Sequence, residues 1–156
     1  MLQRIQSVYL LFITILALAL SFLPLAVLRN GEALYSLDVF GVTTLSTEAE
    51  FVYPVWGLFV LTTLMALLAL VTIFLYKKRI LQIRICVFNA ILMIGFYGFF
   101  AFLIYTMKQE ISGLSVSVKL ALSFPLLSLI LDYLAIRNIG ADEVLVRSAE
   151  RLRSRK

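Results

Sequence analysis

Long apolar runs alternate along this chain with short polar connections. Three runs without any charged residue are 24, 26 and 23 residues long, at 5–28, 51–76 and 85–107. A helix needs about 20 apolar residues to cross a hydrocarbon core roughly 30 Å thick. A fourth apolar segment carries only Lys119 near its start and Asp132 near its end. The pattern predicts four membrane-spanning helices, at about residues 5–28, 54–76, 85–107 and 116–136.

The longest polar connection, residues 29–53, predicts a small β-hairpin. Segments 33–39 and 42–46 are rich in β-forming residues and flank Gly41. Pro54 suits the first turn of the next helix, where its missing N–H costs nothing. The expected fold is an all-α membrane protein, an up-down bundle of four helices with the hairpin between the first two. Residues 1–140 would form the transmembrane domain, and residues 141–156 a basic helical tail.

Composition strengthens the membrane interpretation and narrows the chemistry. The chain is 62% hydrophobic and 15% charged, whereas soluble domains are about 45–50% apolar and 25% charged. A soluble bundle would need helices that are apolar on every face, which is rare outside membranes. The chain has no histidine and one cysteine, Cys86. A Ser-His-Asp triad, the usual zinc clusters and an intrachain disulfide are therefore excluded, and Cys86 is expected to be an inert packing thiol.

The net charge of +5 is unevenly distributed. The central connection, residues 77–84, carries four bases and no acid, and the last twelve residues add more bases. Cytoplasmic segments of membrane proteins are enriched in lysine and arginine. Placing both termini in the cytoplasm puts eleven of the fourteen bases on that side. The residues expected to set this topology include Lys77, Lys78, Arg79, Arg84, Arg147, Arg151 and Arg153.

Polar residues recur at one predicted depth. Counting four residues inward from each predicted cytoplasmic helix end reaches Tyr9, Thr72, Asn89 and Asp132. Each can hydrogen-bond, so we expect an intramembrane polar layer in which Asn89 is the partner of Asp132. The layer could fix helix register or form a proton- or cation-linked site. Alternatively, Asp132 could reach a base such as Arg84 or Arg137 at the interface.

Small residues mark the faces expected to pack. Spacings of four, four and three predict one small, polar face on the fourth helix, formed by Ser117, Ala121, Pro125 and Ser128. This face is expected to point inward, because small residues let helices approach closely in lipid. Gly95 and Gly98 could serve the third helix in the same way.

Several segments resemble a known family. They are the opening QRIQSVYLL at residues 3–11, the central LQIR at 81–84, the LAIR at 134–137, and the ending DE-x-LVRSA-x-RLR at 142–153. Together they resemble domain-of-unknown-function family 4293, small bacterial inner-membrane proteins with four predicted helices. The charge distribution predicts that loop 29–53 lies in the periplasm, and the resemblance implies an inner-membrane location. It implies no activity and no catalytic residues.

These observations favour a non-enzymatic accessory or scaffold subunit of a membrane protein complex. The expected partners are the lipid bilayer and either another membrane protein or further copies of the chain. We expect no cofactor, metal or nucleic acid, and the sequence identifies no small-molecule substrate. The alternative is a small transporter or channel component that uses Asp132. An intramembrane enzyme is the least supported, because no acid–base pair or metal set converges at one depth.

Overall fold

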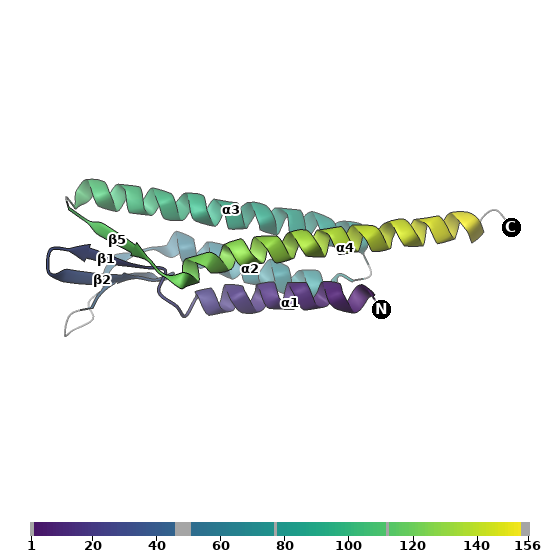
Figure 1. Ribbon diagram of the computed structural model, residues 1–156, viewed down its shortest axis with the longest axis horizontal. Helices are drawn as coiled ribbons and strands as arrows, with labels where there is room; N and C mark the ends of the chain where they lie inside the picture. Colours follow the sequence, from purple (N-terminus) through teal and green to yellow (C-terminus); the bar gives the residue numbers. More distant parts are fainter. Residues whose placement is uncertain (1, 46–50, 77, 112, 154–156) are drawn as a thin grey trace.

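The computed structural model describes residues 2–45, 51–76, 78–111 and 113–153 (Figure 1). Within these residues the helices are α1 (Leu2–Leu20), α2 (Trp56–Phe74), α3 (Arg79–Glu110) and α4 (Phe124–Arg153), and one 3-10 turn spans Leu120–Ser123. The strands are β1 (Ala26–Asn30), β2 (Ala33–Leu37), β3 (Gly41–Thr44), β4 (Phe51–Pro54) and β5 (Ser115–Val118).

Three of the helical segments are long and apolar enough to cross a membrane. They are Trp56–Phe74, Arg79–Glu110 and Leu120–Val146. The apolar part of α1, Ile5–Leu20, is shorter. The predicted number of helices is therefore confirmed, and three of them have the length and composition of membrane spans.

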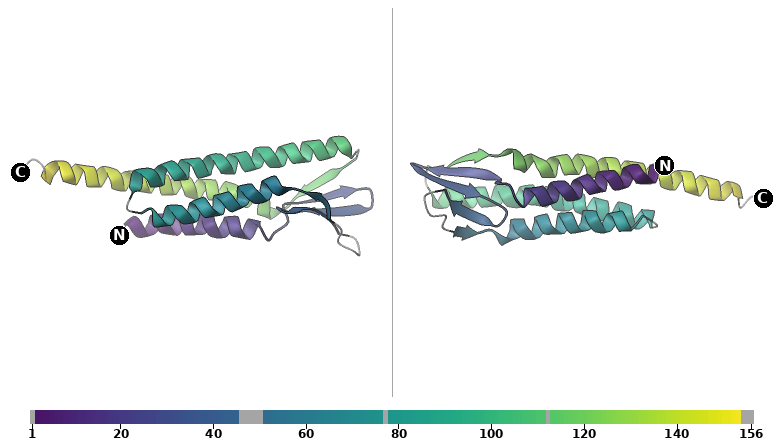
Figure 2. Two further views of the ribbon diagram at one scale, coloured as in Figure 1. Left: turned by 180° about the vertical axis from the view of Figure 1, so that it is seen from behind. Right: turned by 90° about the horizontal axis from the view of Figure 1, so that it is seen from below.

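The helices lie side by side along the long axis of the molecule. α1 packs against α2 and α4, and α3 packs against the same two helices. The sheet lies at one end of this helical body, and both chain termini lie at the other (Figures 1 and 2). We call these the sheet end and the terminal end. α4 projects beyond the other helices at the terminal end (Figure 1).

Buried positions on every helix follow alternating spacings of four and three residues, which bring one stripe to the interior. On α1 the stripe is Gln6, Leu10, Ile13, Ala17 and Leu20, and Thr14 is buried beside it. On α2 the stripe is Leu58, Thr62, Met65, Ala69 and Thr72, and Ala66 is buried beside it. On α3 the stripe is Gln82, Cys86, Asn89, Met93, Phe96, Phe100 and Leu103. On α4 the stripe is Ser128, Asp132, Ala135, Ile139 and Asp142. Polar residues thus share the inward stripes with the apolar core.

The sheet joins the two connections at the sheet end. Its strand order is β4-β3-β2-β1-β5, and every neighbouring pair is antiparallel. β1 and β2 come from the first connection, and β5 from the connection between α3 and α4. Val116 of β5 lies opposite Leu28 of β1. The side chains of Leu28, Leu37 and Val42 are buried on the inner face of the sheet.

The expected hairpin is present but is part of this larger sheet. β2 and β3 pair with Leu37 opposite Val42. The all-α class is therefore wrong in this respect, because the chain is mostly helical with an antiparallel sheet. The sequence pattern missed β1, β4 and β5, and the pairing of β1 with β5 joins segments far apart in the chain.

Several predicted helix boundaries are also wrong. α1 ends at Leu20 rather than residue 28, because Pro24 disfavours helix in the residue before it and Ala26–Asn30 form β1. Pro54 ends β4 opposite Gly41, so α2 begins at Trp56. The fourth helix begins at Phe124 rather than 116, with Pro125 in its first turn.

The basic segments are helical rather than looped. α3 begins at Arg79, six residues earlier than expected, and so includes most of the central connection. α4 continues without a break to Arg153. Residues 141–153 are therefore the last part of α4 and not a separate tail helix.

Candidate functional site

Asp132 is a carboxylate enclosed within the helical body. Its side chain is 0% exposed, on the inward stripe of α4. It interacts with the thiol of Cys86 on α3. This contact lacks the geometry of a hydrogen bond, and neither carboxylate oxygen has a hydrogen-bond partner in the described part of the chain. Cys86 is thus a neighbour of the buried acid as well as a packing residue.

Asn89 lies one turn beyond Cys86 on the same stripe of α3. It is 1% exposed, and its amide nitrogen and oxygen also lack hydrogen-bond partners among the described residues. We call Cys86, Asn89 and Asp132 the buried polar group. Burying polar atoms without partners costs free energy. Such residues inside a membrane helix commonly mark a functional site.

A second set of polar contacts connects the helices nearer the terminal end. Gln6 Nε2 donates a hydrogen bond of 2.7 Å to Asp142 Oδ2, which joins α1 to α4. Arg79 Nη1 donates to the Asp142 backbone oxygen at 3.1 Å, which joins α3 to α4. Gln82 Nε2 donates to the Thr72 backbone oxygen at 3.2 Å, which also accepts from the Leu75 N–H in the last turn of α2. These contacts join α1 to α4, α3 to α4 and α3 to α2.

The predicted layer of Tyr9, Thr72, Asn89 and Asp132 is wrong. The hydrogen bond from Gln82 places Thr72 level with Gln82. Asn89 lies seven residues further along α3, about 10 Å deeper at 1.5 Å per residue. Thr72 Oγ1 bonds within its own helix, to Leu68 O, and Tyr9 is only half-buried. The expected hydrogen bond between Asn89 and Asp132 is absent. The depth count failed because α3 begins six residues earlier than predicted.

The other predicted site residues have mixed placements. Ala121, Pro125 and Ser128 are buried, but Ser117 is exposed in β5, so its assignment to the helical packing face is wrong. Lys78, Arg79 and Arg84 surround the start of α3. Lys77 lies outside the described residues. Arg147, Arg151 and Arg153 belong to the backbone of α4, and their side chains lie outside the description.

Gln6, Gln82 and Asp142 were missed as interior residues. Their spacing contains the signal: Gln6 precedes Leu10 by four residues on the α1 stripe, and Asp142 follows Ile139 by three on the α4 stripe. Extending each apolar stripe by the same spacing toward the end of its helix would have identified all three residues. In the part of the chain that the structure describes, no three His, Cys, Asp or Glu side chains gather to hold a metal ion.

This fold defines a class of protein: four packed helices, three of them long and apolar enough to span a membrane, with a five-stranded antiparallel sheet at one end. The chain belongs to the family described as a domain of unknown function (DUF4293), whose model matches residues 2–152. The resemblance found in the sequence is therefore confirmed. A comparison with curated proteins found no match.

Proposed function

We propose that this protein is a non-catalytic subunit of a bacterial inner-membrane complex and binds a partner protein through its sheet. Both termini lie in the cytoplasm and the sheet lies in the periplasm. The basic residues Lys78, Arg79 and Arg84 at the terminal end support this orientation, because cytoplasmic segments are enriched in bases. The acids Glu32 and Asp38 belong to the opposite end.

One observation carries the proposed partner binding: β5 is a four-residue edge strand with no charged residue, proline or bulge within it. It pairs with β1 on one side and is the last strand of the sheet on the other. Its sequence, Ser115–Val118, contains no charge and no proline. Native edges are usually blunted by lysine, proline or bulges. At the opposite edge, β4 ends in Pro54 and its pairing with β3 is irregular.

The backbone of β5 offers donors to a partner strand. Lys119 N donates to Leu25 O at 2.9 Å, toward the β1 side. Backbone N–H groups alternate in direction along a strand. Ser115 and Ser117 therefore point their N–H groups toward β1, and Val116 and Val118 point theirs to the open edge. An extended segment of a partner protein can pair there by strand addition.

A proline substitution tests this edge directly. Val118→Pro removes an outward N–H while leaving the hydrogen bonds to β1 intact, since proline is tolerated at edge strands. Val118→Thr is the matched control, because it changes the side chain and retains the N–H. The measurement is the mass of the complex extracted gently from native membranes, together with the proteins it contains.

The wild type and Val118→Thr should be extracted in a complex heavier than the 17.6 kDa chain, and Val118→Pro should lose the partner while inserting normally. A mass corresponding to two copies of the chain would identify a homodimer as the complex. If the wild type is extracted alone, or if Val118→Pro retains the partner, the proposal is wrong.

The buried polar group favours a second candidate, a small proton- or cation-linked transport component. Asp132 and Asn89 carry buried polar atoms without hydrogen-bond partners among the described residues. Their burial costs free energy and does not stabilise the fold. Asp132→Asn removes the ionisable group and should abolish proton flux into vesicles that contain the protein, while raising its unfolding temperature. The control Asp38→Asn changes a carboxylate at the sheet end and should leave flux unchanged. Unchanged flux in Asp132→Asn would exclude this candidate.

A further inference from the structure

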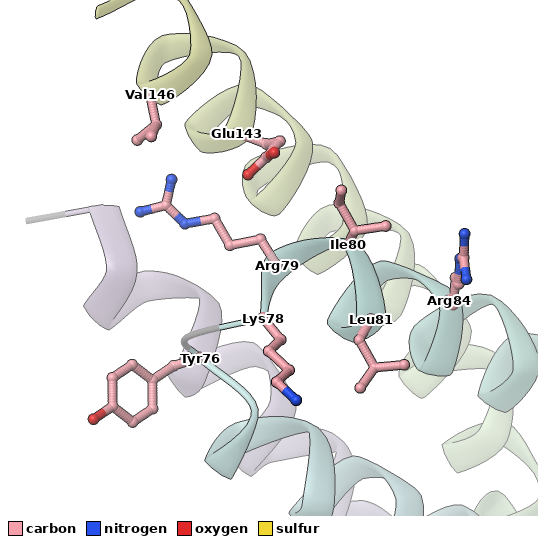
Figure 3. A pocket seen from close by; sticks show the side chains of 8 residues that line it. All are labelled: Tyr76, Lys78, Arg79, Ile80, Leu81, Arg84, Glu143 and Val146. Atoms are coloured by element: carbon pink, nitrogen blue, oxygen red, sulfur yellow. The ribbon is translucent and has the colours of Figure 1, made fainter. Parts of the chain in front are cut away.

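A pocket of about 650 Å³ opens at the terminal end, between the start of α3 and α4 (Figure 3). Three bases line it, Lys78, Arg79 and Arg84, against one acid, Glu143. Arg79 extends beneath α4 toward Glu143 and Val146 (Figure 3), and its Nη1 donates to the Asp142 backbone oxygen. Lys78 and Arg84 are exposed. The pocket therefore has one anchored base and two accessible ones.

The start of α3 adds to the positive character of this pocket. Lys78 is the N-cap residue and makes no side-chain hydrogen bond to the helix. The first turn of a helix has N–H groups without intrahelical acceptors, and its dipole favours anions. Because Lys78 and Arg79 lie at this helix start and Arg84 lies in the next turn, the pocket is suited to phosphate oxygens, which accept hydrogen bonds and carry negative charge.

Apolar side chains lie directly beside these bases. Tyr76, Ile80 and Leu81 line the same pocket and are 48%, 47% and 40% exposed. α3 has 32 residues and is about 48 Å long at 1.5 Å per residue. A bilayer is about 40–45 Å thick with its headgroups, so the start of α3 lies at headgroup level if the helix spans the membrane. A ligand here would meet basic and apolar side chains together (Figure 3).

We propose that this pocket binds the phosphate headgroup of an anionic phospholipid, whose acyl chains follow the apolar surface beside Ile80 and Leu81. Basic pockets between membrane helices on the cytoplasmic side commonly take such headgroups. The inference rests on the membrane insertion in the proposed function and not on the partner at β5. Free inorganic phosphate shares the charge but gains nothing from the apolar side chains.

The test measures the binding of short-chain phosphatidylglycerol, phosphatidylcholine and inorganic phosphate to the full chain in neutral detergent, by native mass spectrometry. The double variant Lys78→Gln/Arg84→Gln removes the accessible bases and leaves the Arg79 contact with α4. Arg137→Gln is the matched control, an exposed base of α4 that does not line the pocket. Unfolding temperatures show whether each variant is folded. If the double variant is not folded, Arg84→Gln alone is measured in its place.

The wild type should prefer phosphatidylglycerol to both other ligands. Each base near an anionic headgroup strengthens binding about fivefold. Arg84→Gln should therefore bind phosphatidylglycerol about fivefold more weakly than the wild type, and the double variant about 30-fold more weakly. Arg137→Gln should stay within twofold of the wild type. The proposal is overturned if inorganic phosphate binds as tightly as the lipid, if Arg137→Gln loses as much as the double variant, or if the double variant binds normally. None of these results would alter partner retention at β5.

Discussion

Gln6 and Asp142 form a hydrogen bond between the first and last helices, in a place from which water is largely excluded. Their side chains are 4% and 8% exposed. Asp132, ten residues earlier on α4, has no comparable partner among the described residues. The two carboxylates therefore differ in role. Asp142 stabilises the packing of α1 on α4, and Asp132 adds a cost that packing alone does not explain.

Gln6→Leu should destabilise the protein by about 1–3 kcal/mol, because it leaves a buried carboxylate oxygen without its donor. The measurement is thermal unfolding in detergent. Gln109→Leu is the control: the Gln109 side chain donates to the Tyr105 hydroxyl on the exposed surface of α3, where substitutions usually change stability by less than about 0.5 kcal/mol. Equal losses in the two variants would show that the bond between Gln6 and Asp142 contributes nothing specific.

Gly57 of α2 lies against the ring of Phe99 on α3. A Cβ on this residue would overlap the tip of the Phe99 ring. By contrast, a Cβ on Gly95 or Gly98 would meet no other atom within 4 Å. The sequence suggested Gly95 and Gly98 as the positions of close approach, but both face away from the neighbouring helices.

Gly57→Ala should therefore destabilise the protein by about 1–3 kcal/mol, because Phe99 must leave its place in the packing. Gly95→Ala and Gly98→Ala should stabilise it by up to about 1 kcal/mol, since alanine is the better helix former. Chemical unfolding monitored by circular dichroism can compare the three. A neutral or stabilising Gly57→Ala would contradict the tight approach of α2 to α3.

At the level of elements, the apolar runs predicted the four helices because burial in lipid requires length and an absence of charge. They could not predict β1, because Ala26–Leu28 are as apolar as the helix before them. Nor could they predict β5, whose register with β1 joins Leu28 to Val116. Such pairings depend on tertiary structure rather than local pattern.

For the candidate site, the sequence identified Asp132 and Asn89 from their polarity and their predicted depth. It could not identify Cys86 as the neighbour of Asp132, because that contact depends on the relative depth of α3 and α4. An error of six residues at the start of α3 moved the predicted layer by about 9 Å. Helix ends are the least certain part of any pattern, and a depth count carries their error directly.

The whole molecule has two unlike ends, a sheet built from both connections and a basic end that carries both termini (Figure 2). The proposed orientation predicts which end faces the periplasm. In a Cys86→Ala background, Glu32→Cys in the turn between β1 and β2 should react with a membrane-impermeant thiol reagent in intact cells. Lys78→Cys should react only after the membrane is opened. The reverse pattern would invert the orientation and place β5 in the cytoplasm.

The central claim is that a partner strand pairs with the open edge of β5. Residue-resolved amide exchange measures this directly, by comparing the complex extracted from native membranes with the isolated chain. Val116 and Val118 should exchange slowly in the complex and quickly in the isolated chain. Ser115 and Ser117, which face β1, should be protected in both. Equally fast exchange of Val116 and Val118 in both samples would contradict the account.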